Sequence, residues 1–277
     1  MTHHRLQEFI GQHSRLFVLT GAGCSTDSGI PDYRDAEGDW KRAQPVSYQS
    51  FMGDEQVRRR YWARSLVGWR WIRKATPNGT HRALAGLEQQ GRLELMVTQN
   101  VDRLHQRAGS TNVVDLHGRL DQVRCMSCEE RTAREDMQNE LLRLNPSWAK
   151  YNAREAPDGD ADLDGVDFSE FDVPPCAACG GLLKPDVVFF GEGVPKERVQ
   201  TAIRHLQQAD AMLVVGSSLM VYSGYRFAQM AAEAGKPIAA VNLGRTRADD
   251  LLSLKVAQPC ASALAFLLAE DTLVPVS

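Results

Sequence analysis

Short runs of β-branched and other apolar residues recur along the chain, and stretches with a different period separate them. Runs of this length suit strands that are buried on both faces of a parallel sheet. Between two of them, Val199, Ile203 and Leu206 recur at helical spacing. This alternation predicts an α/β fold with a doubly wound, Rossmann-like parallel sheet. The strand-like runs are residues 15–20, 93–99, 113–117, 186–191, 211–216 and 237–244.

Two regions interrupt this alternation. Residues 38–92 hold Trp40, Trp62, Trp69 and Trp71 but no strand-like run, and residues 121–183 hold four paired cysteines. We expect both regions to form a smaller lobe, the first helical and the second metal-binding, inserted into the sheet domain. The predicted single domain spans residues 1–277, with a Rossmann-like lobe of residues 1–37, 93–120 and 184–277 and a smaller lobe of residues 38–92 and 121–183.

The second of these regions contains two further patterns. Residues 132–144 place Thr132 and Glu135 at capping-box spacing ahead of apolar residues with a helical period, so we expect a helix that starts with this cap. Residues 155–172 contain eight acidic residues and no basic one, together with prolines and glycines. That composition favours a solvated loop.

Composition and charge limit the function classes. With 43% hydrophobic and 24% charged residues the chain matches an ordinary globular protein, and its net charge of −3 does not support attraction to nucleic acid. No apolar run is long enough to cross a bilayer, so we expect no membrane partner. The first fifteen residues lack the apolar segment of a secretory leader. We therefore expect a cytoplasmic protein.

Four of the six cysteines form two C-x-x-C pairs, Cys125 with Cys128 and Cys176 with Cys179. Two such pairs can supply four thiolates to one tetrahedral zinc ion that keeps no open coordination position. The plain alternative is four unrelated buried thiols. A second alternative is a catalytic zinc, because Glu130 beside Cys128 resembles part of a nucleobase deaminase signature. Since the fourth sulfur would close such a site, we interpret the zinc as structural.

The segment after the first strand-like run is rich in glycine. Gly21, Ala22, Gly23 and Ser25 follow residues 15–20, where backbone N–H groups and a helix N-terminus could bind a phosphate. The fingerprint is incomplete because Thr26 stands where a third glycine belongs, and a simple tight turn is the alternative.

Two later strand ends carry small or polar residues in the same way, at the edge where open α/β sheets bind ligands. These residues are Gly216, Ser217, Ser218, Asn242, Leu243 and Gly244.

Polar side chains also follow the 93–99 and 113–117 runs. Gln99, Asn100 and Asp102 can hydrogen-bond an amide-bearing ligand such as nicotinamide. His117 ends the next strand and is followed by glycine. A lone histidine is often only a structural hydrogen-bonding group, but this location and the pKa range of histidine suit a general base.

Taken together, these segments resemble the sirtuin family in order and spacing over nearly the whole chain. The residues that carry the resemblance are GAGCSTDSGIPDYR (21–34), TQNVDRLH (98–105), HG (117–118), the two cysteine pairs, KPDVVFFGE (184–192), GSSL (216–219) and NLG (242–244). The RYWAR stretch (60–64) and the long gap before the second cysteine pair look most like the class II branch, which contains the fourth mammalian, mitochondrial sirtuin. The lack of a presequence favours a bacterial relative.

The resemblance implies an enzyme that consumes NAD while transferring an acyl group from lysine to ADP-ribose. It assigns catalysis to His117, as the base, and Asn100. It implies acyl-lysine proteins or peptides as partners, and NAD as co-substrate beside one structural zinc. The NAD-binding residues that it implies are Gly21, Ala22, Gly23, Ser25, Ile30, Asp32, Tyr33, Arg34, Gln99, Asn100, Val101, Asp102, His117, Gly216, Ser217, Ser218, Asn242, Leu243, Gly244 and Cys260.

The resemblance also implies a substrate-binding segment, Val188, Phe189, Phe190 and Gly191. Tyr61 and Arg64 lie one helical turn apart and could present a hydroxyl and a guanidinium to an acidic acyl group, as class II relatives do. The alternative is a solvated basic face over a tryptophan-packed helix.

Three functions therefore remain to be compared. The first is an NAD-dependent protein-lysine deacylase that produces nicotinamide, O-acyl-ADP-ribose and free lysine. The second is a protein mono-ADP-ribosyltransferase with the same NAD site. The third is a non-catalytic NAD-sensing or zinc-module interaction protein, against which His117 beside Asn100 and Asp102 argues. An ordinary dehydrogenase is disfavoured because the phosphate fingerprint is incomplete.

Overall fold

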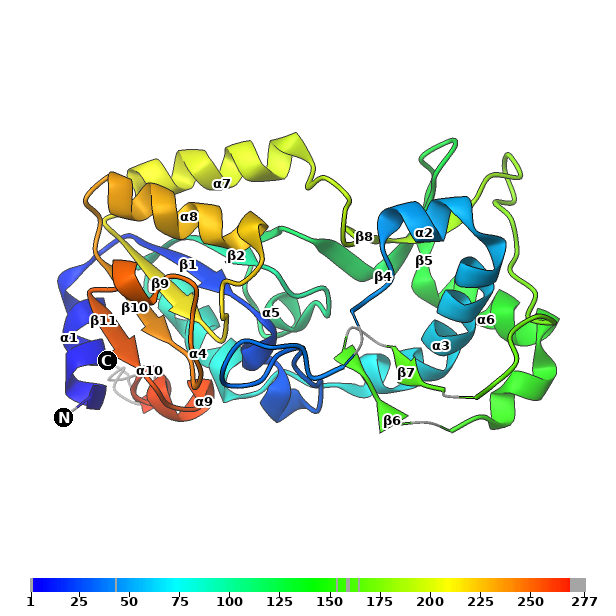
Figure 1. Ribbon diagram of the computed structural model, residues 1–277. Helices are drawn as coiled ribbons and strands as arrows, with labels where there is room; N and C mark the ends of the chain where they lie inside the picture. The colour runs from blue at the N-terminus through cyan, green and yellow to red at the C-terminus, as the bar shows by residue number, and fades with distance from the viewer. Residues whose placement is uncertain (1, 43, 153, 158–159, 164, 270–277) are drawn as a thin grey trace, which may run out of the picture.

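The computed structural model describes residues 2–42, 44–152, 154–157, 160–163 and 165–269. Its larger lobe is built on a six-stranded sheet, whose strands are seen in Figure 1. All neighbouring strands are parallel, in the order β11-β10-β9-β1-β2-β3. This confirms the predicted parallel sheet, although the short edge strand β11 was not predicted. The strands are β1 (Leu16–Thr20), β2 (Leu93–Thr98), β3 (Val113–Asp115), β9 (Ala211–Val215), β10 (Ile238–Val241) and β11 (Leu254–Val256).

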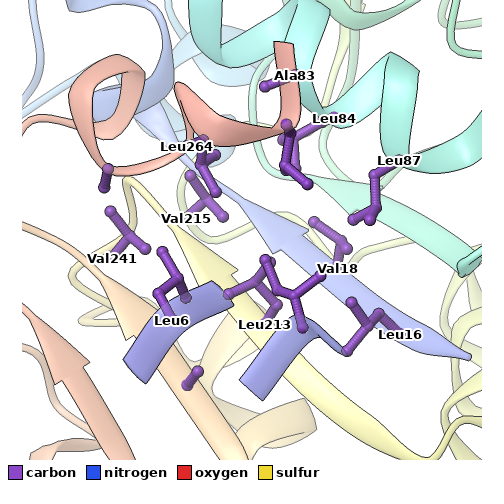
Figure 2. Packing of buried hydrophobic residues seen from close by; sticks show 14 of the residues in the cluster. Leu6, Leu16, Val18, Ala83, Leu84, Leu87, Leu213, Val215, Val241 and Leu264 are labelled. Atoms are coloured by element: carbon purple, nitrogen blue, oxygen red, sulfur yellow. The ribbon is translucent and has the colours of Figure 1, made fainter. Parts of the chain in front are cut away.

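Helices cover both faces of this sheet, which is why the strands β1, β9 and β10 are buried along their whole length. Leu16 and Val18 of β1 face one side, where they join a cluster with Leu84 (Figure 2). Phe17 and Leu19 face the other side and pack with α7 and α8. The first face is covered by α1 (Thr2–Gln12), α4 (Gly79–Gln89), α9 (Cys260–Ala263) and α10 (Phe266–Ala269), and the second by α7 (Lys196–Gln208) and α8 (Tyr222–Glu233).

The smaller lobe lies beside the sheet and has its own core (Figure 1). Phe51, Trp62, Leu66, Val123 and Phe171 are fully buried in it. A three-stranded antiparallel sheet, in the order β5-β4-β8, supports the helices of this lobe. Its elements are α2 (Tyr48–Gly53), α3 (Glu55–Lys74), β4 (Gly118–Cys125), β5 (Arg131–Ala133), α6 (Arg134–Leu144), η3 (Pro146–Lys150), β6 (Arg154–Glu155), β7 (Ala161–Asp162) and β8 (Leu183–Val187).

Two expectations about this lobe differ from the structure. The run 186–191 was expected in the parallel sheet, but β8 pairs antiparallel with β4, and Phe189 then packs in the smaller lobe's core. Residues 38–92 were assigned to the smaller lobe, yet α4 packs against the parallel sheet through Leu84 and Leu87. Both differences have one cause: an apolar run shows that a segment is buried but not which neighbour buries it.

The predicted cap and loop of the smaller lobe also need correction. Thr132 lies in β5, and α6 begins after Ala133 without a side-chain cap. Glu135 instead accepts hydrogen bonds from Trp69 Nε1 at 3.0 Å and from Arg73 at 2.9 Å. Within the acidic segment, β6 and β7 form a short antiparallel hairpin, and Phe171 is fully buried. Apolar residues between the acids therefore anchor a segment that was expected to be solvated.

One membrane-related finding completes the fold. Over the residues that the structure describes, no helix is both long enough and apolar enough to cross a bilayer.

Candidate active site

The carboxyl edge of the parallel sheet brings together loops that are far apart in the sequence. Strand β1 lies between β2 and β9, so the loops that follow these three strands meet where the chain reverses its winding direction. Ligands of open α/β folds bind at this kind of position. The predicted residues Gly21, Asn100 and Ser217 follow β1, β2 and β9 respectively.

The loops after β1 and β9 are packed backbone to backbone. Gly23 N–H donates to the carbonyl of Gly216 at 2.8 Å. A Cβ added to Gly21 would lie 2.8 Å from Ser217 Cβ, and Gly216 has a φ of +62°. These glycines are therefore required by the contact between the two loops, a reason that neither the predicted phosphate site nor the alternative of a simple tight turn had included.

Residues 21–42, all of which the structure describes, contain no α-helix, although one was expected after β1. Two three-residue 3₁₀ helices follow instead, η1 (Ala22–Cys24) and η2 (Thr26–Ser28), and Gly29 ends the second with a φ of +84°. A single 3₁₀ turn aligns too few peptide dipoles to act like the N-terminus of a long helix. Backbone N–H groups remain the means by which this loop can bind a phosphate.

A buried hydrogen-bond network joins the first loop to the loop after β2. Asn100 Nδ2 donates to the Gly21 carbonyl and to Ser25 Oγ, both at 3.1 Å. Ser25 Oγ in turn donates to Asp102 Oδ2 at 2.7 Å. Burial raises the pKa of Asp102, and hydrogen bonds from Leu104 N–H and Ser25 oppose that shift. The predicted carboxamide and carboxylate thus lie in one connected group with the glycine loop.

His117 is oriented as a general base would need to be. Its Nδ1 lies 3.1 Å from the Gln99 carbonyl oxygen, which can only accept, so Nδ1 carries the proton. Nε2 then holds the lone pair and accepts from Ser223 Oγ at 2.7 Å. Burial lowers the pKa of His117 to about 4, which keeps the ring neutral near pH 7. Ser223 was not predicted as a partner of this ring, because 106 residues separate the two.

The glycine after His117 is explained by a close strand contact. Gly118 has a φ of +88°, and a Cβ there would collide with the carbonyl of Asp186 on β8. The next residues on that strand continue the contact, since Val188 N–H donates to the His117 carbonyl at 2.7 Å. The predicted substrate-binding segment therefore starts beside the predicted base.

Aromatic rings connect that segment to both lobes. Phe189 packs edge-on against Phe51 and at a tilt against Tyr61, with ring centroids 5.2 Å apart in each pair. Phe190 is 38% exposed and packs against Trp40, whose ring also lies 3.9 Å from the Arg34 guanidinium carbon. Trp40 was not predicted as a site residue. The sequence feature that could have identified it is a tryptophan close to the 21–34 motif.

The remaining predicted cofactor residues lie around the same edge. Ile30 and Val101 share a buried apolar cluster, and Asp32 pairs with Lys41 at 2.5 Å. Asn242 follows β10 and donates to the Gly244 carbonyl at 3.0 Å. Tyr33 packs edge-on against Trp40, and Gln99 donates to Ser217 Oγ at 2.6 Å. Ser218 is half-buried and Leu243 is 66% exposed. Cys260 is buried at the start of α9.

Tyr61 and Arg64 lie on α3 in the smaller lobe, away from these loops in the chain. Tyr61 is partly buried against Phe51, Trp62 and Phe189. Arg64 binds Asp160 with two hydrogen bonds of 2.8 Å, from Nε and from a terminal nitrogen. The Arg64 side chain is only 17% exposed. The alternative of a solvated basic face is therefore wrong for Arg64, which is held by a carboxylate of the acidic segment.

The four paired cysteines meet in space. Their sulfur atoms all lie within 4.8 Å of one another, with Cys125–Cys179 at 3.5 Å and Cys128–Cys176 at 3.8 Å. Zinc–sulfur bonds of about 2.3 Å in a tetrahedron place the sulfurs about 3.8 Å apart, so the donor set fits zinc. Backbone N–H groups of Cys128 and Ser127 lower the pKa of Cys125 to about 6, which favours the thiolate.

This cluster is remote from His117 along β4. Gly118 begins the strand and Cys125 ends it, so eight extended residues span roughly 25 Å between the two. A zinc with four sulfur ligands at that distance has no position for a reacting water. The geometry supports the structural interpretation over the deaminase alternative.

Comparisons with known proteins agree with this geometry. A family model described as "Sir2 family" matches residues 21–223. An NAD-dependent protein deacetylase of Xanthomonas campestris pv. campestris is 70% identical over 262 residues, which cover 95% of this chain and 89% of that one. NAD-dependent protein deacetylase 2 of Bradyrhizobium diazoefficiens is 65% identical over 268 residues, which cover 97% and 98%.

Solved structures give the same result. A structure described as "Sir2-p53 peptide-NAD+" superposes with a TM-score of 0.77 at 30% identity, covering 99% of this chain and 100% of that one. A structure of "Sir2Tm bound to a propionylated peptide" gives the same four values. The similarity therefore extends over both lobes.

Proposed function

The chain belongs to the Sir2 family, and from that premise we propose that it removes acyl groups from protein lysines in an NAD-dependent reaction. The observation that carries the proposal is the neutral His117, whose Nε2 lone pair lies at the sheet edge beside the network of Asn100, Ser25 and Asp102. A non-catalytic NAD-binding protein would not need a base held in this tautomer. The high-identity relatives are named deacetylases, which does not favour the ADP-ribosyltransferase alternative.

The residues divide the chemistry among them. NAD supplies nicotinamide as a leaving group and a ribose that accepts the acyl group. Within the glycine loop the Ala22 N–H can donate to a phosphate, whereas the N–H groups of Gly21 and Gly23 already donate to the carbonyls of Val215 and Gly216. Gln99 and Ser217 form a hydrogen-bonded pair beside this loop. Asn100 and Asp102 orient the nicotinamide end. His117 accepts a proton from a ribose hydroxyl at Nε2, while the Gln99 carbonyl holds its Nδ1–H.

Asn242 and Cys260 contribute the adenosine side of the site, together with Leu243, Gly244 and Ser218. Val188, Phe189, Phe190 and Gly191 bind the acyl-lysine peptide. Phe190 supports this role because it is exposed while its neighbour Phe189 is anchored in the lobe core.

Cys125, Cys128, Cys176 and Cys179 hold one zinc ion, which stabilises the smaller lobe. We propose a cytoplasmic location, supported by the bacterial relatives, and no direct role for nucleic acid, given the net charge of −3.

We propose that two residues of α3 influence which acyl group the enzyme prefers. Tyr61 and Arg64 would lie at the acyl end of the site, as in class II members. The support is that Tyr61 contacts Phe189, whose backbone neighbour Val188 binds the His117 carbonyl. Asp160 already occupies the Arg64 guanidinium, so an acidic acyl group would have to compete with it.

A panel of acyl-lysine peptides tests the proposed function. Acetyl, long-chain, lipoyl and dicarboxylic acyl groups are each incubated with enzyme and NAD, and products are read by mass spectrometry. Nicotinamide, free lysine and acyl-ADP-ribose are expected in equal amounts. ADP-ribose bound covalently to protein would support the transferase instead, and no nicotinamide release with any peptide would refute both enzymatic functions.

A further inference from the structure

A chain of buried polar groups lies beneath the candidate active site, and none of its inner members has a role in the function proposed above. His81 on α4 and His105 on α5 (Leu104–Arg107) are 0% and 1% exposed, with ring centroids 4.8 Å apart. His105 Nε2 lies 2.9 Å from Thr20 Oγ1, which lies 2.9 Å from Thr98 Oγ1. Thr98 Oγ1 accepts the backbone N–H of Asn100 at 3.1 Å.

The other end of the chain reaches the glycine loop. His81 Nδ1 accepts the backbone N–H of Asn78 at 3.3 Å. Asn78 is the N-cap of α4, and its Nδ2 donates to the Cys24 carbonyl at 2.8 Å and to Ser28 Oγ at 3.0 Å. Both ends of the chain therefore hold loops that form the candidate NAD site.

Hydrogen positions along this chain follow from counting donors and acceptors. Because the Asn78 N–H donates to His81 Nδ1, the proton of His81 is on Nε2. That Nε2 and His105 Nδ1 are both buried without a hydrogen-bond partner in the part of the chain that the structure describes. A buried N–H without an acceptor is costly, so a neighbouring acceptor stabilises it.

Only one direction of the threonine chain gives the His105 N–H an acceptor. If Thr98 donated to Thr20 and Thr20 to His105 Nε2, the proton of His105 would lie on Nδ1, which has no hydrogen-bond partner among the described residues. If Thr20 donates to Thr98 and accepts from His105 Nε2–H, the proton of His105 lies on a bonded nitrogen. The second direction leaves only the His81 Nε2–H of the two rings without an acceptor.

We propose that His81 and His105 are positioning residues, a neutral pair of Nε2–H tautomers that links the glycine loop to the backbone of Asn100. The assignment of those loops to NAD rests on the proposed function, but the tautomers do not. Burial lowers the pKa of His81 to about 4 and that of His105 well below its usual value, in keeping with two neutral rings. Loss of the link is expected to loosen Asn100 and so to weaken binding at the nicotinamide end.

Nitrogen NMR of wild-type protein with ¹⁵N-labelled histidine tests the tautomers at pH 7, with ring signals assigned from His81→Gln and His105→Gln. Each of the two rings should show one protonated nitrogen, Nε2, and one unprotonated nitrogen. A protonated Nδ1 or an imidazolium at either position would overturn the proposal. This measurement needs no activity, so it stands even if the proposed function fails.

Kinetics then test the positioning role. His105→Leu removes the donor to Thr20, whereas His105→Gln places an amide N–H where Nε2–H was. Loss of one buried hydrogen bond predicts about a tenfold increase in KM for NAD for the Leu variant, largely restored by Gln. Equal KM values for the two variants would contradict a positioning role and leave a structural one.

Thr98→Val offers a milder test, because it keeps the side-chain volume and removes the hydroxyl that accepts from both Thr20 Oγ1 and the Asn100 N–H. Its KM for NAD should rise more than its kcat falls. The matched control is Thr80→Val: Thr80 is fully buried beside His81, and its Oγ1 has no hydrogen-bond partner among the described residues. Unchanged KM in Thr98→Val would refute the link, as would equal changes in both variants.

Discussion

The parallel sheet and the smaller lobe are stabilised by different means. Side chains of β1 alternate between two apolar clusters, so the sheet is held by burial of hydrocarbon on both faces. The smaller lobe has an apolar core as well, but it also buries Arg134 at 1% exposure, between Trp62 and Trp69. That guanidinium donates to the Ser65 carbonyl and hydroxyl, and burial lowers its pKa to about 10.

The difference shows where each region is vulnerable. A hydrophobic sheet core tolerates the loss of one side chain at a cost of about 2–5 kcal/mol. The smaller lobe depends on a few polar anchors and on four thiolates that repel each other without a cation. The lobe should therefore respond to metal and charge changes that leave the sheet intact.

Metal removal should have the largest effect. Purified protein should hold about one zinc per chain, and Cys176→Ala should lose it, because structural zinc contributes on the order of 10 kcal/mol to folding. Hydrogen exchange should accelerate at Val123 in the lobe and much less at Val214 in the sheet. Cys24→Ala, at a buried cysteine outside the cluster, should retain the metal. Full activity and unchanged exchange in metal-free protein would contradict the structural assignment.

His117→Ala should have the opposite effect to metal removal, because it should lower activity and leave folding unchanged. Removal of a general base predicts a fall in kcat of about 10²–10⁴-fold, with NAD affinity largely retained. His205→Ala is the control: that half-buried histidine pairs with Glu94 near the start of β2, whereas the site residues follow the end of that strand. Turnover in His117→Ala equal to that of the control would leave the mechanism without its base.

Acidification should weaken the sheet region through its buried histidines. The pKa values of His81 and His117 are lowered to about 4, and that of His105 is lowered as well, from an unfolded value near 6.5. The unfolded chain thus binds more protons below pH 6.5, so stability is full above that pH and is lost as pH falls toward 4.

Each histidine should lower the free energy of unfolding by about 1 kcal/mol as the pH falls from 6.5 to 5.5. Urea unfolding across pH 5.5–7.5 measures the slope. A constant free energy of unfolding over this range would show that the three rings are not held neutral.

The sequence predicted the sheet far better than its surroundings, for a physical reason. Strands such as residues 211–216 are buried on both faces, so they can be recognised in the sequence as uninterrupted apolar runs. The same signal placed 186–191 in the wrong sheet, because burial against β4 and burial against β1 require the same residues. Thr132 and Glu135 had the spacing of a cap, but pairing of β5 with β4 kept Thr132 in a strand.

Site residues on one loop were predictable, whereas partners from distant segments were not. Gln99, Asn100 and Asp102 follow one strand, so sequence spacing alone puts them at the sheet edge. Ser223 reaches His117, and Asp160 reaches Arg64 across 96 residues, only through the tertiary fold. No local pattern marks one carboxylate among eight in the acidic segment.

The smallest predicted effect decides what Arg64 does. If its guanidinium binds acidic acyl groups, a charge-assisted hydrogen bond of about 1.5–3 kcal/mol is lost in Arg64→Met. The kcat/KM for glutaryl-lysine peptide should then fall about 10–150-fold relative to that for acetyl-lysine peptide. Asp160→Asn should shift the same ratio in the opposite direction, because it removes the carboxylate that competes for the guanidinium.

The alternative role of Arg64 is to clamp the β6–β7 hairpin against α3 through Asp160. In that case both variants should lower kcat/KM for the two peptides equally, since either change breaks the same ion pair. Glu170→Gln removes a charge from an exposed position of the same acidic segment. It should leave kcat/KM unchanged for both peptides. Opposite shifts in Arg64→Met and Asp160→Asn can arise only if Asp160 and the acyl carboxylate compete for one guanidinium. That result would make the ion pair a selectivity device that keeps the site for neutral acyl groups.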